Sequence, residues 1–172
     1  LRAARRAIFL GFTMAQHITA SLQRIVYGFL LAAVLAVALG LITGWSQTVS
    51  ALVTPAMELL RPIPPLAWIP FAIFFFGSPF DAIFLVVLAS FFPIVLSTHH
   101  GVREIDPVLI AGARTLGARR LQLFSLVVVP AALGSIITGA RVGLGVAWMS
   151  IVAAEMVGVE GGGLGVYVWS SA

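Results

Sequence analysis

The 172-residue chain contains no cysteine and no lysine. Without cysteine it has no disulfide, no thiolate metal ligand and no cysteine nucleophile. All ten basic residues are arginines, so a P-loop lysine and a lysine Schiff base are excluded as well. The absence of cysteine and lysine therefore excludes enzymes that depend on a cysteine nucleophile, a P-loop lysine or a lysine Schiff base.

Charge of either sign is scarce too. Only 9% of the residues are charged, against about a quarter in an average soluble domain. Hydrophobic residues make up 60% of the chain, and the mean hydropathy is +1.10. This composition is typical of membrane proteins. The net charge of +4 comes from scattered arginines rather than a basic stripe, so we predict no nucleic-acid partner.

The chain begins at Leu1 and stops within an apolar, glycine-rich stretch. We expect it to be a fragment of a longer protein. An apolar run follows Arg2, Arg5 and Arg6, but it carries no convincing cleavage site. We therefore do not interpret it as a cleavable signal peptide.

Four long windows carry no charge. They lie between Arg24 and Glu58, Arg61 and Asp81, Asp81 and Arg103, and Arg120 and Arg141. A spanning helix needs about 20 mainly apolar residues, and an arginine or aspartate at its centre costs about 3 kcal/mol. We predict an all-α, polytopic transmembrane bundle with spans near 22–44, 50–77, 82–102 and 121–156. Residues 1–172 are expected to form a single transmembrane domain.

The second predicted span is interrupted by Arg61-Pro62-Ile63-Pro64-Pro65. Each proline removes an amide donor, so a regular helix cannot continue through it. Broken backbone at membrane depth has to be surrounded by protein or by a water-filled cavity. Two interpretations are open here: a stretch that lines a transport path, or a helix end at the membrane interface.

The fourth predicted span is too long for one straight crossing of a hydrocarbon core about 30 Å thick. Pro130 and several glycines offer places to bend. Small residues recur four apart, as in Ala36, Gly40 and Gly44 of the first span. Such spacing lets transmembrane helices pack closely, but it specifies no function.

The orientation follows from the polar connection 103–120. It holds four arginines and two acidic residues, so the positive-inside rule places it in the cytoplasm. The turn at 44–50 is then inside, and the turn at 77–81, the N-terminal segment and 155–165 are outside. Arg2, Arg5 and Arg6 depart from the rule, which an upstream span would explain.

Two turn signals frame a short helix within this connection. Asp106-Pro107 predicts its start, with the aspartate as N-cap and the proline at the first helical position. Gly117 allows a sharp turn, after which a second helix is expected to open at Arg119. The connection is therefore predicted to be structured rather than a free loop.

The short helix is predicted to be amphipathic. Leu109, Gly112 and Leu116 share one face by three- and four-residue spacing. A small amphipathic helix at the cytoplasmic face either rests on the bilayer or seats in a groove of a partner protein. The pattern of residues does not choose between these uses.

At this connection the sequence resembles the inner-membrane permeases of ABC importers. Their signature reads Glu-Ala-Ala, three residues, Gly, nine residues, a hydrophobic residue, any residue, Leu and Pro. Here the order is Ala111-Gly112-Ala113, Arg114-Thr115-Leu116, Gly117 and, after nine residues, Val127-Val128-Val129-Pro130. The spacing from glycine to proline matches, whereas Ala111, Gly112 and Val129 replace the glutamate, the first alanine and the leucine.

Further strings are similar to the nitrate, sulfonate and taurine branch of these permeases. They are Ser21-Leu22-Gln23-Arg24 with Gly28-Phe29, the run from Leu60-Arg61-Pro62 to Trp68-Ile69-Pro70, Gly139-Ala140-Arg141 through Trp148 to Ala153-Ala154-Glu155-Met156, and Gly163-Leu164-Gly165. Each string is short, but their order and spacing together are specific. The resemblance covers the chain from about Met14 to Ala172.

The resemblance implies the type I ABC importer permease (MetI-like) fold and a transport subunit rather than an enzyme. It implies a second permease copy, two cytoplasmic ATPase subunits and an extracytoplasmic substrate-binding protein. ATP would be used by the ATPase, and this chain would bind no cofactor and no metal. The protein would lie in the bacterial inner (cytoplasmic) membrane and import a small oxyanion such as nitrate, sulfonate or taurine.

The same resemblance indicates which residues couple the chain to an ATPase. They are Asp106, Leu109, Gly112, Ala113, Arg114, Leu116, Gly117 and Pro130. In such a loop the glycine turn would transmit movement of the ATPases to the spans on either side, so the two permease halves would alternate between inward- and outward-facing states.

A second set of residues is assigned to the translocation path. They are Arg61, Pro64, Trp68, Arg141, Trp148 and Glu155. Intramembrane charge is expensive and tends to face cavities, so Arg141 is hypothesised to attract oxyanions, the alternative being a structural or snorkelling arginine. Glu155 is expected to be an outer-interface charge, although pairing with an arginine or contact with a binding protein would also fit.

Three further alternatives concern a metal site, another class of transporter and an enzyme. His99 and His100 point about 100° apart on a helix and have no third ligand nearby, so interface polar residues are favoured over a metal site. A secondary transporter or channel that works without an ATPase is the alternative function. An intramembrane enzyme would need a nucleophile with a base or a metal cluster, and the sequence offers neither at workable spacing.

Overall fold

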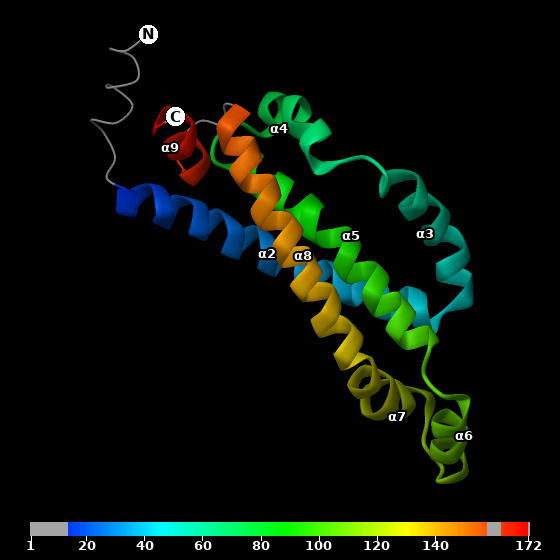
Figure 1. Cartoon of the computed structure of the whole chain (residues 1–172). Coiled ribbons are helices and arrows are strands. Elements are labelled where there is room, and N and C mark those ends of the chain that lie inside the picture. The colour runs from blue at the N-terminus through cyan, green and yellow to red at the C-terminus, as the bar shows by residue number, and fades with distance from the viewer. Residues whose placement is uncertain (1–13, 158–162, 172) are drawn as a thin grey trace. The chain divides into compact units, whose positions relative to one another are not determined.

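A computed structural model describes residues 14–157 and 163–171, and all its regular elements are helices (Figure 1). In chain order they are α2 (Met14–Trp45), α3 (Gln47–Leu60), the 3₁₀ helix η1 (Pro65–Trp68), α4 (Ile69–Phe76), α5 (Phe80–Arg103), α6 (Pro107–Thr115), α7 (Arg120–Leu123), the π-helical segment η2 (Phe124–Val128), α8 (Val129–Val157) and α9 (Leu164–Ser171). The all-α prediction is therefore confirmed for the described part of the chain.

Three of these helices are long and apolar enough to cross a membrane. They are α2, α5 and the continuous helical stretch Arg120–Val157, and a fourth crossing results if α3 and η1–α4 form one interrupted span. The spans expected at 22–44, 82–102 and 121–156 fall inside these three helices. The fourth region, where Pro130 was expected to allow a bend, is irregular at this place. The π-helical segment η2 has Val129 as its C-cap, and Pro130 follows directly.

The interruption expected in the second span is present. Helix α3 ends at Leu60 with Arg61 as its C-cap, and η1 starts at Pro65. The prolines between them lack amide hydrogens, so they cannot continue the backbone ladder of α3. The chain resumes as a helix only where Pro65 occupies a first-turn position that needs no amide donor.

The chain divides into two compact units. Unit 1 contains the described residues 14–32, 63–90, 144–157 and 163–171, and its core is formed mainly by Ile25, Ile69, Leu85, Val86 and Ile151. Gly28 lies against Val86 so closely that a Cβ would sit 2.7 Å from Val86 Cγ1. A glycine at this position therefore allows α2 and α5 to touch.

Unit 2 contains residues 33–62 and 91–143. Here Gly40 faces Thr98 and Gly44 faces Val102. A Cβ at Gly40 would lie 2.6 Å from the Cβ of Thr98, and a Cβ at Gly44 would lie 2.5 Å from the Cβ of Val102. The contacts advance together along both helices, so these parts of α2 and α5 run parallel. The predicted small-residue face of the first span is thus the face that packs.

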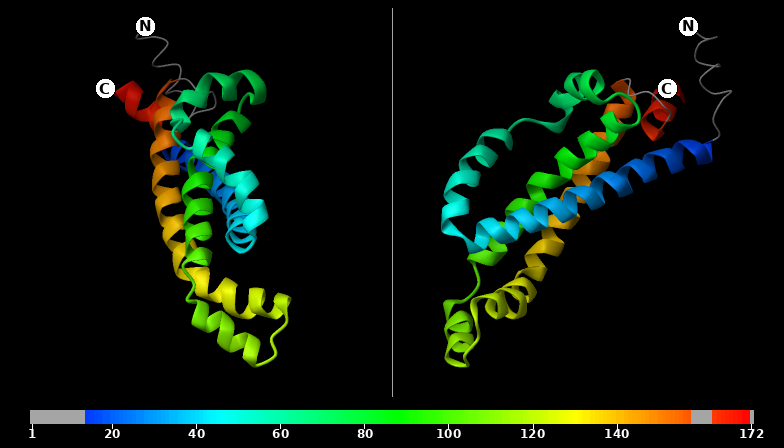
Figure 2. Two further views of the ribbon diagram at one scale, coloured as in Figure 1. Left: turned by 90° about the vertical axis from the view of Figure 1, so that its right-hand side faces the viewer. Right: turned by 180° about the vertical axis from the view of Figure 1, so that it is seen from behind.

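Helix α8 packs on α5 in the opposite direction within unit 2. Gly139 of α8 lies against Ser97 of α5, whereas Gly101 of α5 lies against Ser135 of α8. One contact moves forward along the chain as the other moves back, so the two segments are antiparallel. Helix α6 lies beside α7 at the end of this unit, as Figures 1 and 2 show. Whether residues 1–172 act as a single domain stays a prediction.

Candidate functional site

The connection between α5 and α8 folds into a capped helix, as the sequence predicts. Asp106 is the N-cap of α6, and its Oδ1 accepts a hydrogen bond of 2.8 Å from the amide of Val108. Pro107 occupies the first helical position, where its missing amide costs nothing. Residues 106 and 107 therefore fix where α6 begins.

The end of α6 is a Schellman motif centred on Gly117. The amide of Ala118 donates to the carbonyl of Ala113 at 3.1 Å, and the amide of Gly117 donates to that of Arg114 at 2.9 Å. Gly117 has a φ of +83°, a left-handed conformation that residues with a Cβ adopt only with strain. The predicted sharp turn is confirmed, and the backbone explains why glycine occupies it.

The second helix of the connection opens where it was predicted. Arg119 is the N-cap of α7, and its amide donates to the side chain of Gln122 at 2.8 Å. Helix α7 continues through η2 into α8. Pro130 lies in the first turn of α8, where it is exposed.

Helix α6 is unusually exposed for an apolar helix, and none of its residues is buried. Val108, Leu109 and the following Leu116 are 72%, 55% and 89% exposed. Gly112 lies between them in sequence with open space where a Cβ would be. A nine-residue helix is too short to be stable alone in water, so an exposed apolar surface on it suits a partner or a membrane.

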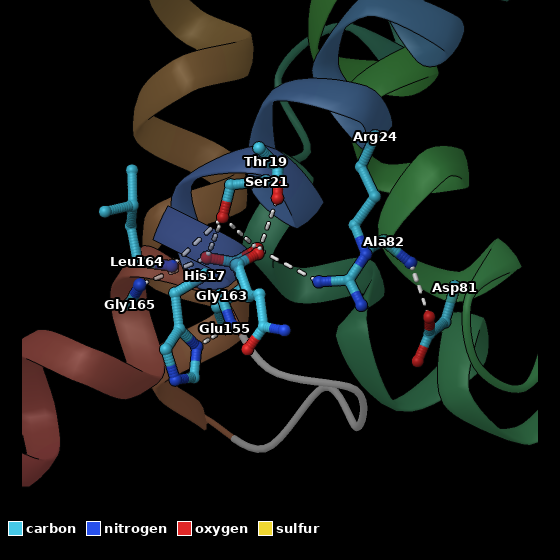
Figure 3. A network of polar contacts seen from close by, with 11 residues as sticks. His17, Thr19, Ser21, Arg24, Asp81, Ala82, Glu155, Gly163, Leu164 and Gly165 are labelled. Atoms are coloured by element: carbon cyan, nitrogen blue, oxygen red, sulfur yellow. Dashed lines mark hydrogen bonds and ion pairs between the residues drawn. The ribbon is translucent and has the colours of Figure 1, made fainter. Parts of the chain in front are cut away.

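A second cluster, a network of polar contacts that was not predicted from the sequence, surrounds Glu155 in unit 1 (Figure 3). Its carboxylate is buried and forms a salt bridge with Arg24, with Nη1 3.1 Å from Oε1. The Ser21 hydroxyl lies 2.7 and 2.9 Å from the two carboxylate oxygens. Both α2 residues therefore hold a side chain of α8.

The beginning of α9 completes this cluster. The amide of Gly165 donates to Glu155 Oε2 at 3.1 Å, and the amide of Leu164 donates to the Ser21 oxygen at 3.0 Å. The amide of Gly163 donates to His17 Nδ1 at 2.9 Å. A carboxylate at the first turn of a helix satisfies amides that have no partner within the helix and is stabilised by the helix dipole.

Two glycines make this approach possible. A Cβ at Gly163 would collide with the carboxylate of Glu155, and a Cβ at Gly165 would collide with the carbonyl oxygen of Val152. At Gly165 the obstacle is backbone, which cannot rotate away as the end of a side chain can. The string Gly163-Leu164-Gly165 therefore has a steric reason.

For Glu155, the pairing with an arginine that the sequence left open is the arrangement that the structure shows. Its side chain is fully buried and paired with Arg24, the alternative that was considered less favourable. A lone buried charge in apolar surroundings is very costly, so Glu155 can be buried only because several donors surround it. His17, Ser21 and Arg24 follow each other at helical spacing, a polar stripe that could have indicated the cluster.

The role of the other residues assigned to the translocation path stays a prediction. Arg61 and Arg141 belong to unit 2, and Pro64, Trp68 and Trp148 belong to unit 1. Arg141 is exposed on α8, as are Arg61 and Pro64 around the interruption, and Trp148 is partly exposed. His99, considered above as a metal ligand, instead lies 3.1 Å from the Thr43 hydroxyl through Nδ1.

These features define a class: a polytopic helical membrane protein whose spans are joined by an exposed, firmly capped helix. The model of the family described as binding-protein-dependent transport system inner membrane component matches residues 36–172. The chain belongs to this family. Its fold is therefore the type I ABC importer permease fold, as predicted, and the family is one of transport components rather than of enzymes.

Individual relatives agree with this family. The chain is 46% identical over 146 residues to a protein of Methanocaldococcus jannaschii whose name describes it as an ABC transporter permease protein, covering 84% of this chain and 55% of that protein. It is 40% identical over 164 residues to the taurine transport system permease protein TauC of Escherichia coli, covering 95% and 59%. It is 38% identical over 156 residues to the nitrate import permease protein NrtB of Leptolyngbya laminosa, covering 90% and 56%.

The chain thus spans between half and two thirds of the length of these relatives. The similarity to the nitrate and taurine permeases confirms the branch that the sequence strings indicated. The family gives the chain a multi-pass membrane location.

Proposed function

We propose that the chain belongs to the permease subunit of an ATP-driven importer in the bacterial cytoplasmic membrane. The observation that carries this proposal is α6, a short exposed helix fixed by Asp106 at one end and by the Gly117 turn at the other. Such a helix can transmit a displacement because its ends cannot fray. A flexible loop of the same length would absorb the movement instead.

In this proposal α6 seats in a groove of a cytoplasmic ATPase. Its exposed Val108, Leu109 and Leu116 supply the apolar contact that a groove would bury. ATP is bound and hydrolysed by the ATPase alone. Two copies of the permease, two ATPases and an extracytoplasmic binding protein make up the assembly, and the permease halves alternate between two states.

The substrate proposed is a small oxyanion of the nitrate, sulfonate or taurine kind. The support comes from the names of the relatives, which describe nitrate and taurine permeases, and from Arg141. This arginine lies exposed on a helix long and apolar enough to span a membrane. A charge at such a place tends to face a water-filled path, where it would raise the local concentration of anions.

The experiment that tests the proposal uses the complete transporter in proteoliposomes with its binding protein. Uptake of nitrate, taurine or an alkyl sulfonate should require ATP hydrolysis on the side of α6, and an ATPase should copurify. Uptake that continues without ATP, driven by an ion gradient, would instead establish the secondary transporter. Replacement of Arg141 by Gln should then slow oxyanion uptake, whereas unchanged uptake would assign Arg141 a structural role.

A further inference from the structure

Two cavities in unit 2 lie against α6, each of about 570 Å³. They share Trp45, the last residue of α2, and Arg114 of α6. One cavity is also lined by Arg120 and Leu123, and the other by Arg103 and Val102 among others. Trp45 and Arg114 therefore line both hollows between α6 and the ends of the long helices.

The charge of these cavities has one sign. Arg103, Arg114 and Arg120 line them, and no acidic residue does. The nearby carboxylate of Asp106 is engaged in capping α6. None of the three arginines forms a salt bridge with another described residue; the salt bridge found among the described residues joins Arg24 and Glu155 in unit 1. The three guanidinium groups thus present unneutralised charge.

The cavities lie at the level where the apolar helices end. Trp45 closes α2, Arg103 closes α5, and Arg120 opens the long stretch that leads into α8. Tryptophan and arginine are the residues that anchor spanning helices at the membrane–water boundary. The inner walls are apolar, with Val102, Leu123 and Val128 buried. Such a site has a charged mouth and an apolar floor.

We propose that these cavities bind the headgroup of an anionic phospholipid from the cytoplasmic leaflet. Guanidinium groups bind phosphate oxygens through two parallel hydrogen bonds, and basic pockets between helices on this side of a membrane select anionic lipids. A headgroup in one cavity joins Arg114 of α6 to Arg103 at the end of α5, and a headgroup in the other joins Arg114 to Arg120 of α7. The inference rests on the cytoplasmic orientation in the proposed function.

The face of α6 that lines the cavities is separate from the face offered to an ATPase. Ile110, Ala111 and Arg114 line a cavity, whereas Val108, Leu109 and Leu116 are exposed. Lipid and ATPase can therefore occupy opposite sides of one helix. The arginines are accordingly assigned to the lipid rather than to acidic residues of the ATPase.

The test is lipid retention by the complete transporter, measured by native mass spectrometry after exchange into phosphatidylglycerol or phosphatidylcholine. Phosphatidylglycerol should be retained, and its retention should weaken as salt rises. The double variant Arg103→Gln/Arg120→Gln should bind it about 25-fold more weakly, about fivefold for each arginine. Arg119→Gln is the matched control, because Arg119 is exposed in the same connection and lines neither cavity.

Three results would overturn the lipid site: equal retention of both lipids, phosphatidylglycerol retention unchanged in the double variant, or loss of the copurifying ATPase with lipid retention intact. The last would assign the arginines to the ATPase. A further variant, Arg103→Lys/Arg120→Lys, keeps the charge and should retain more lipid than the glutamine pair. Lipid retention and uptake are measured separately. A loss of lipid retention would leave the importer proposal standing, and lipid retention can still be measured if ATP-dependent uptake fails.

Discussion

At the scale of single residues, Gly117 carries the strongest backbone requirement in the connection. Its φ of +83° and its place in a Schellman motif mean that any side chain adds strain, about 1–2 kcal/mol for most residues. The strain falls on the turn that joins α6 to α7. Nothing lies within 4 Å of a Cβ at this position, so the cost comes from the backbone and not from a clash.

We predict that Gly117→Asp uncouples the transporter: the protein inserts in the membrane and ATP is hydrolysed, but uptake falls at least tenfold. The aspartate both strains the turn and adds a negative charge between two arginine-bearing segments. ATP hydrolysis and uptake are measured on the same proteoliposomes. Gly117→Asn serves as the control, since asparagine tolerates this conformation better and should keep most of the coupling. Normal uptake by Gly117→Asp would contradict the role of the turn.

Glu155 is the second residue with a clear energetic role. We predict that Glu155→Ala destabilises the protein by about 3–5 kcal/mol, because it removes the carboxylate from a buried pair with Arg24. The thermal unfolding midpoint of the purified transporter measures this loss. The double variant Arg24→Gln/Glu155→Gln should be more stable than Glu155→Ala, since it leaves no buried charge. An unfolding midpoint equal to that of the wild type would show that the cluster contributes little.

At the scale of elements, α9 is held by the fit of two glycines against Glu155 and Val152. We predict that Gly165→Ala loosens α9, since a Cβ there meets the carbonyl oxygen of Val152 and lies 2.8 Å from Glu155 Cβ. Hydrogen–deuterium exchange should become faster across 164–171. Gly145→Ala on α8 is the control, because a Cβ there meets nothing within 4 Å and alanine favours a helix interior. Equal exchange in both variants would contradict the steric account.

The elements that the sequence predicted well are those with local signals. The start and end of α6 follow from Asp106-Pro107 and Gly117, and the interruption after α3 follows from its prolines. Capping and proline effects act within a few residues, so the sequence alone contains them. The small-residue face of α2 was recognised for the same reason, although its partner on α5 was not.

The Glu155 cluster could not be predicted in this way. It joins residues 131 and 134 positions apart in the chain, and only the packing of α2, α8 and α9 brings them together. The resemblance strings had already contained Ser21, Arg24, Glu155 and the Gly163–Gly165 pair. That these residues contact one another is seen only when the three helices are packed together. Arg141 and Trp148 belong to the same string as Glu155, but no contact joins Trp148 to this cluster in the described part of unit 1, and Arg141 belongs to unit 2.

At the scale of the whole molecule, the direction of the helices agrees with the predicted order of crossings. Within unit 2, α2 and α5 run parallel and α8 runs antiparallel to them. Successive crossings of a membrane alternate in direction, so α3 and α4 must together return the chain between α2 and α5. The interrupted pair is therefore expected to count as one crossing, which gives four in the described residues.

The orientation predicted from the charges of 103–120 places α6 in the cytosol, where an ATPase can bind it. The chain contains no cysteine, so single cysteines can report on it without interference from its own residues. Leu109→Cys places a thiol on the exposed face of α6. Ser78→Cys places a thiol in the turn between α4 and α5, which the same topology puts on the outer side.

The most direct measurement is labelling of these two variants with a maleimide that cannot cross the cytoplasmic membrane. In intact spheroplasts we predict labelling of Ser78→Cys and none of Leu109→Cys, and in inside-out vesicles the reverse. Labelling of Leu109→Cys in intact spheroplasts would put α6 on the wrong side of the membrane and would contradict the proposed coupling to an ATPase.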